Sequence, residues 1–497
     1  MPRALLSVYD KTGIVEFARS LQLFGWEIIA SGGTAKTLTD SGIVVVDVAE
    51  VTGFPAILGH RVVTLHPAVH GGILADLNVV EHRSDMERHD IHPIDMVVVG
   101  LYPFESEPST DLIDIGGPAL IRAAAKNSSR VTVITDARQF ELVLAELRAS
   151  GGVGAATRAQ LAAEAFALTA RYDARIARWL TTKEGEWPRQ VTLELEHESD
   201  LRYGENPHQR AARYRIVGER SWLSTAQQLG GKEMSYLNVY DADAAWSLAH
   251  RFAEPTAVVV KHANPCGVAT ADDIATAYRR ANDCDPVSAF GGIVALNRTM
   301  TAATAMAMAD VFTEVVVAPD FEQGALGLLR SKKNLRIILA TAPYRDGMSL
   351  RGVDGGVLMQ QHDEVVADPE HWRIVTKARP TPDQLRDAAL AWVVSAATSS
   401  NAIVLVKESR TVGIGAGQQN RVDAARIACA RAGGRARGAV AASDAFFPFR
   451  DGVDALASAG VSLIVQPGGS QRDDESITAA DEHGIVMLFT DRRHFRH

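Results

Sequence analysis

The sequence has few cysteines, no excess of positive charge and no long apolar run. Cys266, Cys284 and Cys429 form no CxxC pair and cannot all pair with one another, so we expect a reducing compartment and a cytoplasmic protein. The formal net charge of −9 argues against a nucleic-acid partner but leaves room for local basic pockets that hold a phosphorylated metabolite. No run is long enough to cross a membrane, and residues 5–8 are too short for a signal-peptide core. We therefore predict a soluble protein with neither nucleic acid nor membrane as its partner.

The remaining composition is that of an ordinary globular protein with several cores. The chain has 497 residues, of which 46% are hydrophobic and 22% charged, and this length suggests about three domains. Near the N-terminus, strand-like residues 4–8 precede a helical pattern over 14–23 and a second strand-like run over 26–30. This alternation predicts an α/β fold with a doubly wound parallel sheet.

A glycine-containing loop follows the second predicted strand. Ser31-Gly32-Gly33-Thr34 places small residues and backbone N–H groups at the start of a predicted helix, which suits a phosphate. The loop is neither a P-loop nor a dinucleotide fingerprint. An ordinary turn between strand and helix fits it equally well.

Two histidines have the spacing of a metal-binding pair. His66 and His70 are four residues apart, but no third ligand is suggested, and Pro67 is expected to disturb the helix. We therefore predict no metal site there.

A lysine and a histidine lie side by side after a β-branched run. Residues 258–260 are three valines, followed by Lys261 and His262, and then by Asn264-Pro265-Cys266-Gly267, which we predict to be a turn. The end of a strand in an open α/β sheet is where ligands bind, and this pair could stabilise charge and move a proton. The alternative is a snorkelling lysine beside an ordinary hydrogen-bonded histidine.

A polar linker and an internal echo indicate the domain organisation. Residues 181–188 are polar and interrupted by glycine and proline, which predicts a boundary between domains at 1–190 and 200–497. Residues 258–261 are similar in sequence to 404–407, and residues 288–290 to 443–446, in both cases about 150 residues further along the chain. We therefore predict two similar halves, at about 200–370 and 375–497, with a joint near 379–382.

Six motifs occur in order before residue 130: SVYDKTG, SGGTAK, RVVTLHPAVHGGILA, LYPF, DIGG and RAAAKN. Together they resemble the N-terminal domain of a bifunctional purine-biosynthesis family that joins AICAR formyltransferase to IMP cyclohydrolase. The resemblance implies a fold similar to methylglyoxal synthase and a cyclohydrolase site. The residues implied to hold the nucleotide, chiefly its phosphate, are Tyr9, Asp10, Lys11, Ser31, Gly32, Gly33, Thr34, Arg61 and Thr64. It also implies that Lys126 gives or accepts a proton, with Tyr102 and Asp114 beside it.

These residue types suit ring closure, in which a carboxamide nitrogen attacks a formyl carbon and water is lost. Asp114 can accept the amide proton, and a lysine can protonate the departing oxygen. Three features depart from the family pattern: Val63 replaces the usual lysine, Gly100 replaces the usual asparagine, and the segment before Asp114 is shorter by about one helix. One alternative is therefore a formyltransferase whose N-terminal domain binds a nucleotide but is catalytically impaired.

The rest of the chain resembles the formyltransferase domain of the same family. Its motifs are RYGENPHQ, VVVKHANPCG, SAFGGIVALN, GIGAGQQNRVDAAR, SDAFFPFRDGVD, QPGGS and RRHFRH. The resemblance implies two cytidine-deaminase-like α/β subdomains. Because the zinc-deaminase signature is missing after Cys266, we predict that fold without its zinc.

The resemblance also assigns roles at the formyltransferase site. His262 would be the general base on the 5-amino group, and Lys261 would stabilise the transition state. The implied AICAR contacts are Arg202, Tyr203, Gly291, Asn401, Arg421, Phe446 and Arg493, with Glu314 where the family has an aspartate. The implied folate contacts are Val422, Asp451, Ser470 and Gln471.

The expected activity is formylation of AICAR with 10-formyltetrahydrofolate as co-substrate, followed by closure of formyl-AICAR to IMP. An aromatic amine beside a carboxamide is a poor nucleophile, so assistance by a base is chemically reasonable. No catalytic metal is expected, and a monovalent cation is a further candidate ligand. The resemblance implies a homodimer with formyltransferase sites at the subunit interface. A non-catalytic metabolite sensor is a rival interpretation, but the presence of Lys261, His262, Arg202 and Asn401 together argues against it.

Overall fold

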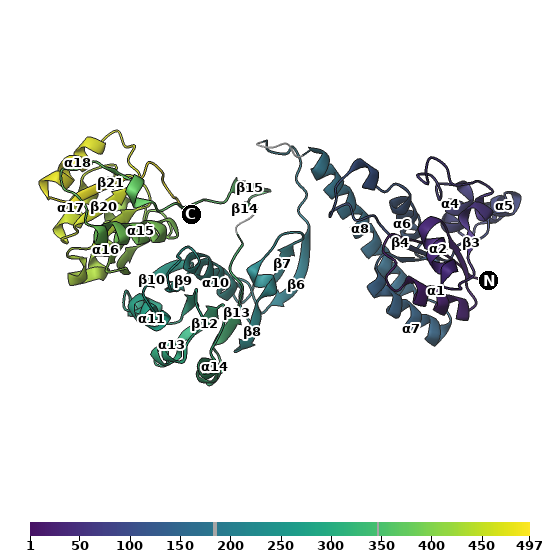
Figure 1. Cartoon of the computed structure of the whole chain (residues 1–497), viewed down its shortest axis with the longest axis horizontal. Helices are drawn as coiled ribbons and strands as arrows, with labels where there is room; N and C mark the ends of the chain where they lie inside the picture. Colours follow the sequence, from purple (N-terminus) through teal and green to yellow (C-terminus); the bar gives the residue numbers. More distant parts are fainter. Residues whose placement is uncertain (182–185, 345–346) are drawn as a thin grey trace. The chain divides into compact units, whose positions relative to one another are not determined.

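The computed structural model describes residues 1–181, 186–344 and 347–497. Residues 182–185, in the middle of the predicted linker, lie outside the described residues. The chain separates into two compact units, Met1–Glu194 and Leu195–His497, which run from purple to blue and from teal to yellow in Figure 1. Each unit is described by itself below.

The first unit is built on a five-stranded parallel sheet. Its strands are β1 (Arg3–Val8), β2 (Glu27–Ala30), β3 (Val46–Asp47), β4 (Met96–Gly100) and β5 (Thr132–Ile134). Its helices are α1 (Ile14–Leu23), α2 (Gly32–Asp40), α3 (Val48–Thr52), α4 (Pro67–Leu74), α5 (Val80–Arg88), α6 (Gly116–Lys126), α7 (Phe140–Ser150) and α8 (Ala155–Thr181). The strand order is β3-β2-β1-β4-β5, and all neighbours are parallel. The predicted doubly wound parallel sheet is confirmed.

Adjacent central strands bring the first candidate site together. β1 and β4 pair in register from Ala4 with Met96 to Val8 with Gly100, so both strands end at the same edge of the sheet. The backbone N–H of Tyr9 donates to the carbonyl of Gly100 at 3.0 Å. Ligands of open parallel sheets bind beyond this carboxyl edge, and the loops that follow β1, β2 and β4 lie there.

The second unit contains a twelve-stranded mixed sheet and two small hairpins. The hairpins are β6 (Leu195–Leu201) with β7 (Ala211–Ile216) and β14 (Met348–Val353) with β15 (Gly356–Gln361). The sheet's strands are β8 (Gln227–Gly230), β9 (Thr256–Lys261), β10 (Asn264–Thr270), β11 (Gly292–Leu296), β12 (Thr313–Ala318), β13 (Arg336–Leu339), β16 (Arg373–Ile374), β17 (Ile403–Lys407), β18 (Arg410–Gly415), β19 (Val440–Ser443), β20 (Leu463–Gln466) and β21 (Val486–Phe489). The helices are α9 (Trp222–Thr225), α10 (Tyr236–Ala249), α11 (Ile274–Asn282), α12 (Pro286–Ala289), α13 (Ala302–Ala307), α14 (Gln323–Arg330), α15 (Pro382–Ala396), α16 (Arg421–Ala432), α17 (Asp451–Ser458) and α18 (Asp473–Glu482).

The large sheet repeats one strand pattern on both sides of its middle. Outward from the centre, the order is β10-β9-β11-β12-β13-β8 on one side and β18-β17-β19-β20-β21-β16 on the other. Corresponding neighbours also have the same parallel or antiparallel sense. The second unit is therefore a duplicated arrangement joined edge to edge.

The two repeats meet along a short antiparallel seam. The ladder between β10 and β18 contains the pair Ala269 and Arg410. Beside it, the buried Thr411 hydroxyl accepts a hydrogen bond from the backbone N–H of Val268 at 2.8 Å and donates to its carbonyl at 3.2 Å. A side-chain hydroxyl thus satisfies backbone groups that the ladder leaves unpaired at the seam.

The turn predicted at residues 264–267 is wrong. β10 begins at Asn264, and the chain reverses instead through His262 and Ala263, whose φ angles are 54° and 55°. Lys261 pairs with Asn264 across this two-residue loop, and the ladder shifts between Pro265 and Gly267. That irregularity accommodates a proline inside a strand, so composition alone was misleading.

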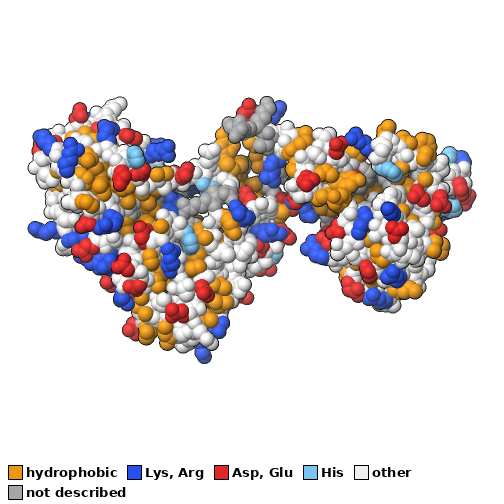
Figure 2. Space-filling model, viewed as in Figure 1, with side chains coloured by type: hydrophobic (Ala, Val, Ile, Leu, Met, Phe, Trp, Pro, Cys, Tyr) orange, Lys and Arg blue, Asp and Glu red, His pale blue; other side chains and the backbone are white. Residues whose placement is uncertain are grey.

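The surface carries mixed charge. On the face drawn in Figure 2, lysine and arginine side chains are interspersed with aspartate and glutamate. None of the helices in the described part of the chain combines the length and apolar composition that a membrane crossing requires.

Candidate active sites

At the edge of the first unit's sheet, two tyrosines and two charged residues surround the end of β1. The rings of Tyr9 and Tyr102 meet edge to face, with centroids 5.4 Å apart. Asp10 accepts hydrogen bonds from the backbone N–H and the hydroxyl of Thr12, at 2.9 and 2.7 Å, and the hydroxyl contact is the main reason that the pKa of Asp10 is lowered. Lys11 donates to the carbonyls of Val8 and Tyr9, while burial lowers its pKa. Lys11 therefore holds its own loop as well as contributing positive charge.

The loop of residues 31–34 forms the first turn of α2 beside Lys11. Ser31 is the N-cap residue, and its side chain makes no capping hydrogen bond. The Thr34 hydroxyl accepts from the backbone N–H of Val8 at 3.2 Å and donates to its carbonyl at 3.1 Å, so it ties the helix to β1. The first N–H groups of a helix have no acceptor within the helix. Together with Lys11, they form an end that suits an anion.

A second loop contacts the start of α6. Thr64 is buried and packs closely against Gly116. A Cβ added at Gly116 would lie 3.2 Å from Thr64 Oγ1. Asp114 accepts a hydrogen bond from the backbone N–H of Gly117 at 2.8 Å, and burial is the main cause of its raised pKa. Arg61 pairs with Asp111 at 2.6 Å, but both side chains are largely exposed, so this pair stabilises the loop little.

The structure does not bring Lys126 to Asp114 within one chain. Asp114 precedes α6, whereas Lys126 is its exposed last residue. A helix rises 1.5 Å per residue, so the eleven residues of α6 separate them by roughly 16 Å. A lysine at this end also interacts favourably with the helix dipole, and that contribution requires no catalytic role.

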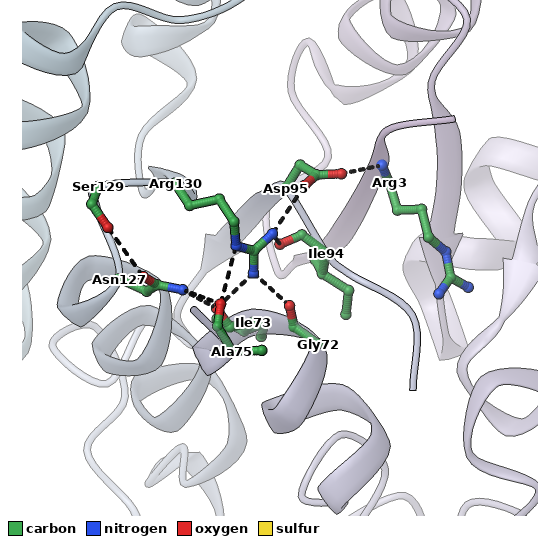
Figure 3. Close-up of polar contacts among 9 residues, drawn as sticks. All are labelled: Arg3, Gly72, Ile73, Ala75, Ile94, Asp95, Asn127, Ser129 and Arg130. Atoms are coloured by element: carbon green, nitrogen blue, oxygen red, sulfur yellow. Dashed lines mark hydrogen bonds and ion pairs between the residues drawn. The ribbon is translucent and has the colours of Figure 1, made fainter. Parts of the chain in front are cut away.

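A partly buried polar cluster next to Lys126 fixes the C-terminal end of α4. The Arg130 guanidinium donates to the carbonyls of Gly72 at 2.6 Å and Ile73 at 3.0 Å, and to Asp95 Oδ1 at 2.9 Å. Asn127 Nδ2 adds hydrogen bonds to the carbonyls of Ile73 and Ala75, at 2.7 and 3.1 Å. Figure 3 shows Arg130 between Asp95 and these α4 carbonyls. The cluster thereby holds the helix that begins three residues after Thr64.

Arg130→Met should lower the free energy of unfolding of the first unit by about 2 kcal/mol, because the partly buried Asp95 would lose its cationic partner and the carbonyls of Gly72 and Ile73 would each lose one donor. Denaturant unfolding of the full chain measures this loss. Arg148→Met is the matched control, since Arg148 pairs with Glu141 at an exposed site, where a pair contributes about 0–1 kcal/mol. Equal losses in the two variants would contradict the role given to Arg130.

The paired histidines have separate structural settings. His66 caps α4 by accepting a hydrogen bond from the backbone N–H of Ala68 at 3.2 Å, and Pro67 is the first residue of the helix. The expectation that Pro67 disturbs the helix is therefore wrong, because proline is well suited to that position. His70 Nε2 is buried without a partner, and burial lowers the pKa of His70. Within residues 1–181, 186–344 and 347–497, no three histidine, cysteine or acidic side chains gather as metal ligands.

In the second unit, Lys261 and His262 lie at the end of β9. The Lys261 ammonium donates to the carbonyl of Phe290 at 2.9 Å, whereas His262 lies in the turn and is exposed. Gly291, the residue after Phe290, has a φ of 76°, and its N–H donates to the carbonyl of Phe312 at 2.8 Å. The lysine is thus held in place while the imidazole remains accessible.

Residues from the second repeat reach this turn. Asn264 donates to the carbonyl of His262 at 3.1 Å and accepts from the backbone N–H of Ser399 at 2.8 Å. Two residues further on, Asn401 donates from its backbone and its side chain to the carbonyl of Gln418, at 3.0 and 2.9 Å. The candidate site is therefore assembled across the seam.

Arg421 is the most deeply buried charge among the predicted substrate contacts. Its guanidinium pairs with the fully buried Asp444 at 2.8 Å and donates to the carbonyl of Phe446 at 2.9 Å. Ser400 also donates to Asp444, which connects this pair to the loop of Asn401. Arg421 Nε is buried without a partner. A buried donor without a partner costs free energy, so this nitrogen is a candidate for a further contact.

Glu314 has a buried cationic partner. It forms an ion pair with Arg336, whose Nε also donates to the carbonyl of Glu233 at 3.1 Å. The Arg336 side chain is nearly inaccessible, while that of Glu314 is partly exposed. The negative charge of the Glu314 carboxylate is therefore largely balanced by Arg336.

The other predicted contacts lie on separate elements. Arg202 lies over the ring of Tyr203 at 5.1 Å, just after β6, and Arg493 lies over a neighbouring phenylalanine at 4.6 Å. The predicted folate contacts are placed at the start of α16, at the start of α17 and before α18; they are Val422, Asp451, Ser470 and Gln471. In the described chain, no hydrogen bond or ion pair links these positions, Arg202 or Tyr203 directly to His262.

Several buried or partly buried polar residues near the second site were not found from the sequence. They are Asp241, Asp444 and Arg496, each of which makes hydrogen bonds with the segments described above. One signal was available, since the pattern Asp-Ala-x-x-Ala-Trp occurs at both 241–246 and 387–392. It marks the same helix position in the two repeats.

Known proteins resemble the whole chain. A model of the AICARFT/IMPCHase bienzyme matches residues 124–431, and a model of the MGS-like domain matches residues 13–128, which confirms the fold predicted for the N-terminal part. The crystal structure of ForH matches 36% of this chain and 98% of its own chain at 34% identity, with a TM-score of 0.34, which is too low to bear on the fold.

Curated relatives match from end to end. Bifunctional purine biosynthesis protein PurH of Magnetococcus marinus is 48% identical over 100% of this chain and 99% of its own length. The proteins of that name from Thermoanaerobacter sp. and Bacillus mycoides are 47% and 49% identical, with the same coverage. This chain belongs to the AICARFT/IMPCHase bienzyme family.

Proposed function

We propose that the chain catalyses the last two steps of IMP synthesis. It transfers a formyl group from 10-formyltetrahydrofolate to AICAR and then closes the ring of formyl-AICAR. The observation that carries this function is the match to bifunctional relatives along the whole chain. Two compact units, each with its own candidate site, fit two separate reactions.

For formyl transfer, we assign the chemistry to His262 and Lys261. His262 accepts the proton of the 5-amino group as its nitrogen attacks the formyl carbon. Lys261 stabilises the negative charge that develops on the formyl oxygen, from a position fixed by its hydrogen bond to Phe290. The bond between the formyl carbon and the folate nitrogen then breaks, and the folate nitrogen leaves with a proton.

Substrate binding is assigned to the buried cluster beside this pair. The unpartnered Nε of Arg421 supports a role in holding the anionic part of AICAR, and Asn401 lies in the connected loop. Folate contacts at Val422, Asp451, Ser470 and Gln471 remain predictions from the resemblance. The co-substrate supplies the one-carbon unit, no catalytic metal enters this mechanism, and a monovalent cation is proposed only as an additional ligand.

For ring closure, we assign the base to Asp114. Its raised pKa makes it a better proton acceptor than an ordinary aspartate, and its hydrogen bond to Gly117 fixes one carboxylate oxygen. The first turn of α2 and Lys11 would hold the phosphate, with Tyr102 at the mouth of the site. Protonation of the departing oxygen by Lys126 remains a prediction, since Lys126 lies at the other end of α6.

The alternative of a formyltransferase with an impaired N-terminal domain is not favoured, because relatives that are named as bifunctional match the chain throughout. One departure that suggested it has a structural role, since Val63 packs against the first unit's hydrophobic core. Gly100 lies at the end of β4, where its backbone carbonyl accepts the N–H of Tyr9, a contact that does not depend on the side chain.

A cytoplasmic homodimer is part of the proposal. Beside Lys261, Val287 is 85% exposed, Phe290 is 59% exposed and Phe312 is 44% exposed. Apolar side chains exposed together at a candidate site favour an interface. We propose that a second copy of the chain covers them and completes the formyltransferase site.

Dilution to the monomer should therefore abolish formyl transfer before it affects ring closure. The measurement is a sedimentation series with both activities assayed at matched protein concentrations. Phe290→Ser should shift the loss of formyl transfer to higher protein concentration, and Leu23→Ser, an exposed apolar position in the other unit, is the control. A demonstrated monomer with full formyl transfer would rule out a shared site.

A coupled assay tests the function as a whole. The purified chain receives AICAR and 10-formyltetrahydrofolate, and the release of tetrahydrofolate and IMP is followed separately. Both products should appear, and supplied formyl-AICAR should yield IMP without folate. Tetrahydrofolate without IMP would support the impaired alternative, and the absence of both products would favour a sensor.

A further inference from the structure

The turn that presents His262 has an unfavourable backbone conformation. Both His262 and Ala263 have φ angles in the left-handed region, at 54° and 55°. Side chains with a Cβ disfavour this region, and two-residue hairpin loops that need it usually contain Asn-Gly. A catalytic candidate held in such a conformation requires neighbours that stabilise it.

A buried carboxylate provides this stabilisation on the N–H side. Asp241 Oδ2 accepts the backbone N–H of His262 at 3.0 Å, and its Oδ1 accepts that of Ala263 at 2.8 Å. Asp241 lies on α10 and is only 8% exposed, so water competes little for these bonds. Because one carboxylate takes both N–H groups, it fixes the orientation of the turn and the direction in which the imidazole leaves the backbone.

The carbonyl side of the turn is held as well. Arg496 Nη1 donates to the carbonyls of Ala263 and Ala397, at 2.6 Å in both cases. Asn264 donates to the carbonyl of His262. All four backbone polar groups of the two turn residues therefore have partners.

The second repeat contains the same carboxylate clamp. Asp387, on α15, accepts the backbone N–H groups of Glu408 and Ser409, at 2.9 and 2.7 Å. These two residues also have left-handed φ angles, of 56° and 59°. The geometry of Asp241 thus recurs 146 residues further along the chain.

The copy lacks the catalytic side chain and lies elsewhere on the sheet. Glu408 occupies the place that His262 has in the first repeat. Since β10 and β18 are antiparallel, the second turn lies at the opposite end of the seam, where the Ser409 carbonyl accepts the N–H of Thr270 at 3.0 Å. The chain therefore offers a matched comparison, with the same clamp beside an imidazole and away from it.

We infer that Asp241 is a positioning residue for formyl transfer: through the turn backbone, it holds His262 where the imidazole can accept the proton of the 5-amino group. This inference rests on the proposed role of His262. Asp241 itself neither contacts the substrate nor carries the proton.

The test compares Asp241→Asn with Asp387→Asn in the full-length chain. In both variants, the amide retains one acceptor oxygen and places an NH2 group against the other backbone N–H, so the two should lose similar thermal stability. Formyl-transfer kcat should fall by about 100-fold in Asp241→Asn alone, because a small misplacement of a catalytic group has an effect of this size. The KM for AICAR should change little, and ring closure should be unchanged in both variants.

A second pair of variants tests the backbone directly and also serves if Asp241→Asn does not fold. Glycine adopts the left-handed conformation without steric cost, so Asp241→Asn with Ala263→Gly should recover part of the lost kcat. Asp387→Asn with Ser409→Gly should recover stability without changing formyl transfer.

Two results would overturn the inference: equal losses of formyl transfer in Asp241→Asn and Asp387→Asn, or wild-type kcat in a folded Asp241→Asn when His262→Ala is inactive. Formyl transfer that survives His262→Ala would instead contradict the proposed role of His262. The failure of the inference and the failure of the function are therefore distinguishable.

Discussion

His262→Ala should reduce formyl transfer by at least about 100-fold, the contribution expected of a general base. Ring closure of supplied formyl-AICAR should be unchanged, because His262 lies in the unit Leu195–His497 and Asp114 lies in Met1–Glu194. The exposed position of His262 also makes a large effect on folding unexpected. Steady-state kinetics of the two half-reactions measure the difference.

The control is His371→Ala, which removes an exposed imidazole from the same unit, where it pairs with Asp368 at 2.7 Å. This variant should retain both activities. If His262→Ala slows ring closure as much as formyl transfer while remaining folded, the assignment of the two reactions to two units is wrong.

Asp114→Asn should lower ring closure by at least about 100-fold, because the amide cannot accept a proton, and should leave formyl transfer intact. Gly117→Ala provides a steric counterpart. A Cβ there would come within 2.2 Å of Asp114 Oδ2 and 2.8 Å of Leu101 Cδ2, so the carboxylate would have to move. Both variants are assayed on purified formyl-AICAR, and robust ring closure in both would exclude Asp114 as the base.

The stability of Asp114→Asn relative to the wild type should depend on pH. Because burial raises the pKa of Asp114, the folded chain retains this proton to higher pH than the unfolded chain does. The stabilising contribution is complete below the unfolded pKa and is lost as the pH rises through the folded pKa. Asparagine stays neutral, so Asp114→Asn should unfold like the wild type at low pH and be more stable at neutral pH. The test is to measure the unfolding free energies of both proteins across pH. A variant that is no more stable than the wild type at neutral pH would contradict this prediction.

Local patterns predicted the first unit well because its strands and helices have clear periods. Strand β1, helix α1 and the parallel sheet follow from short apolar runs that alternate along the chain with helical patterns. Burial of these apolar residues in the core decides their conformation. Turn composition was less reliable. Asn264 to Gly267 have typical turn residues, yet the reversal occurs at His262 and Ala263, where a distant carboxylate compensates for the backbone conformation.

Proximity within the sites was harder to predict than the identity of the motifs. Asp114 and Lys126 belong to neighbouring motifs, but the helix between them carries one away from the other. Conversely, Asn401 and Asn264 are far apart in sequence and are joined through Ser399 and its neighbours. Such contacts depend on how the repeats meet, which no local pattern encodes.

The two clamps on the His262 turn differ greatly in the length of chain that each must close. Asp241 is 21 residues from His262, whereas Arg496 is 233 residues from Ala263. Closing the longer loop has the larger entropic cost, and long-range contacts generally form later in folding. The hairpin can thus acquire its shape while the first repeat folds, and it is joined to the loop of Asn401 only when the two repeats assemble. In this order of folding, the His262 turn is oriented first, and its contacts with the second repeat form last.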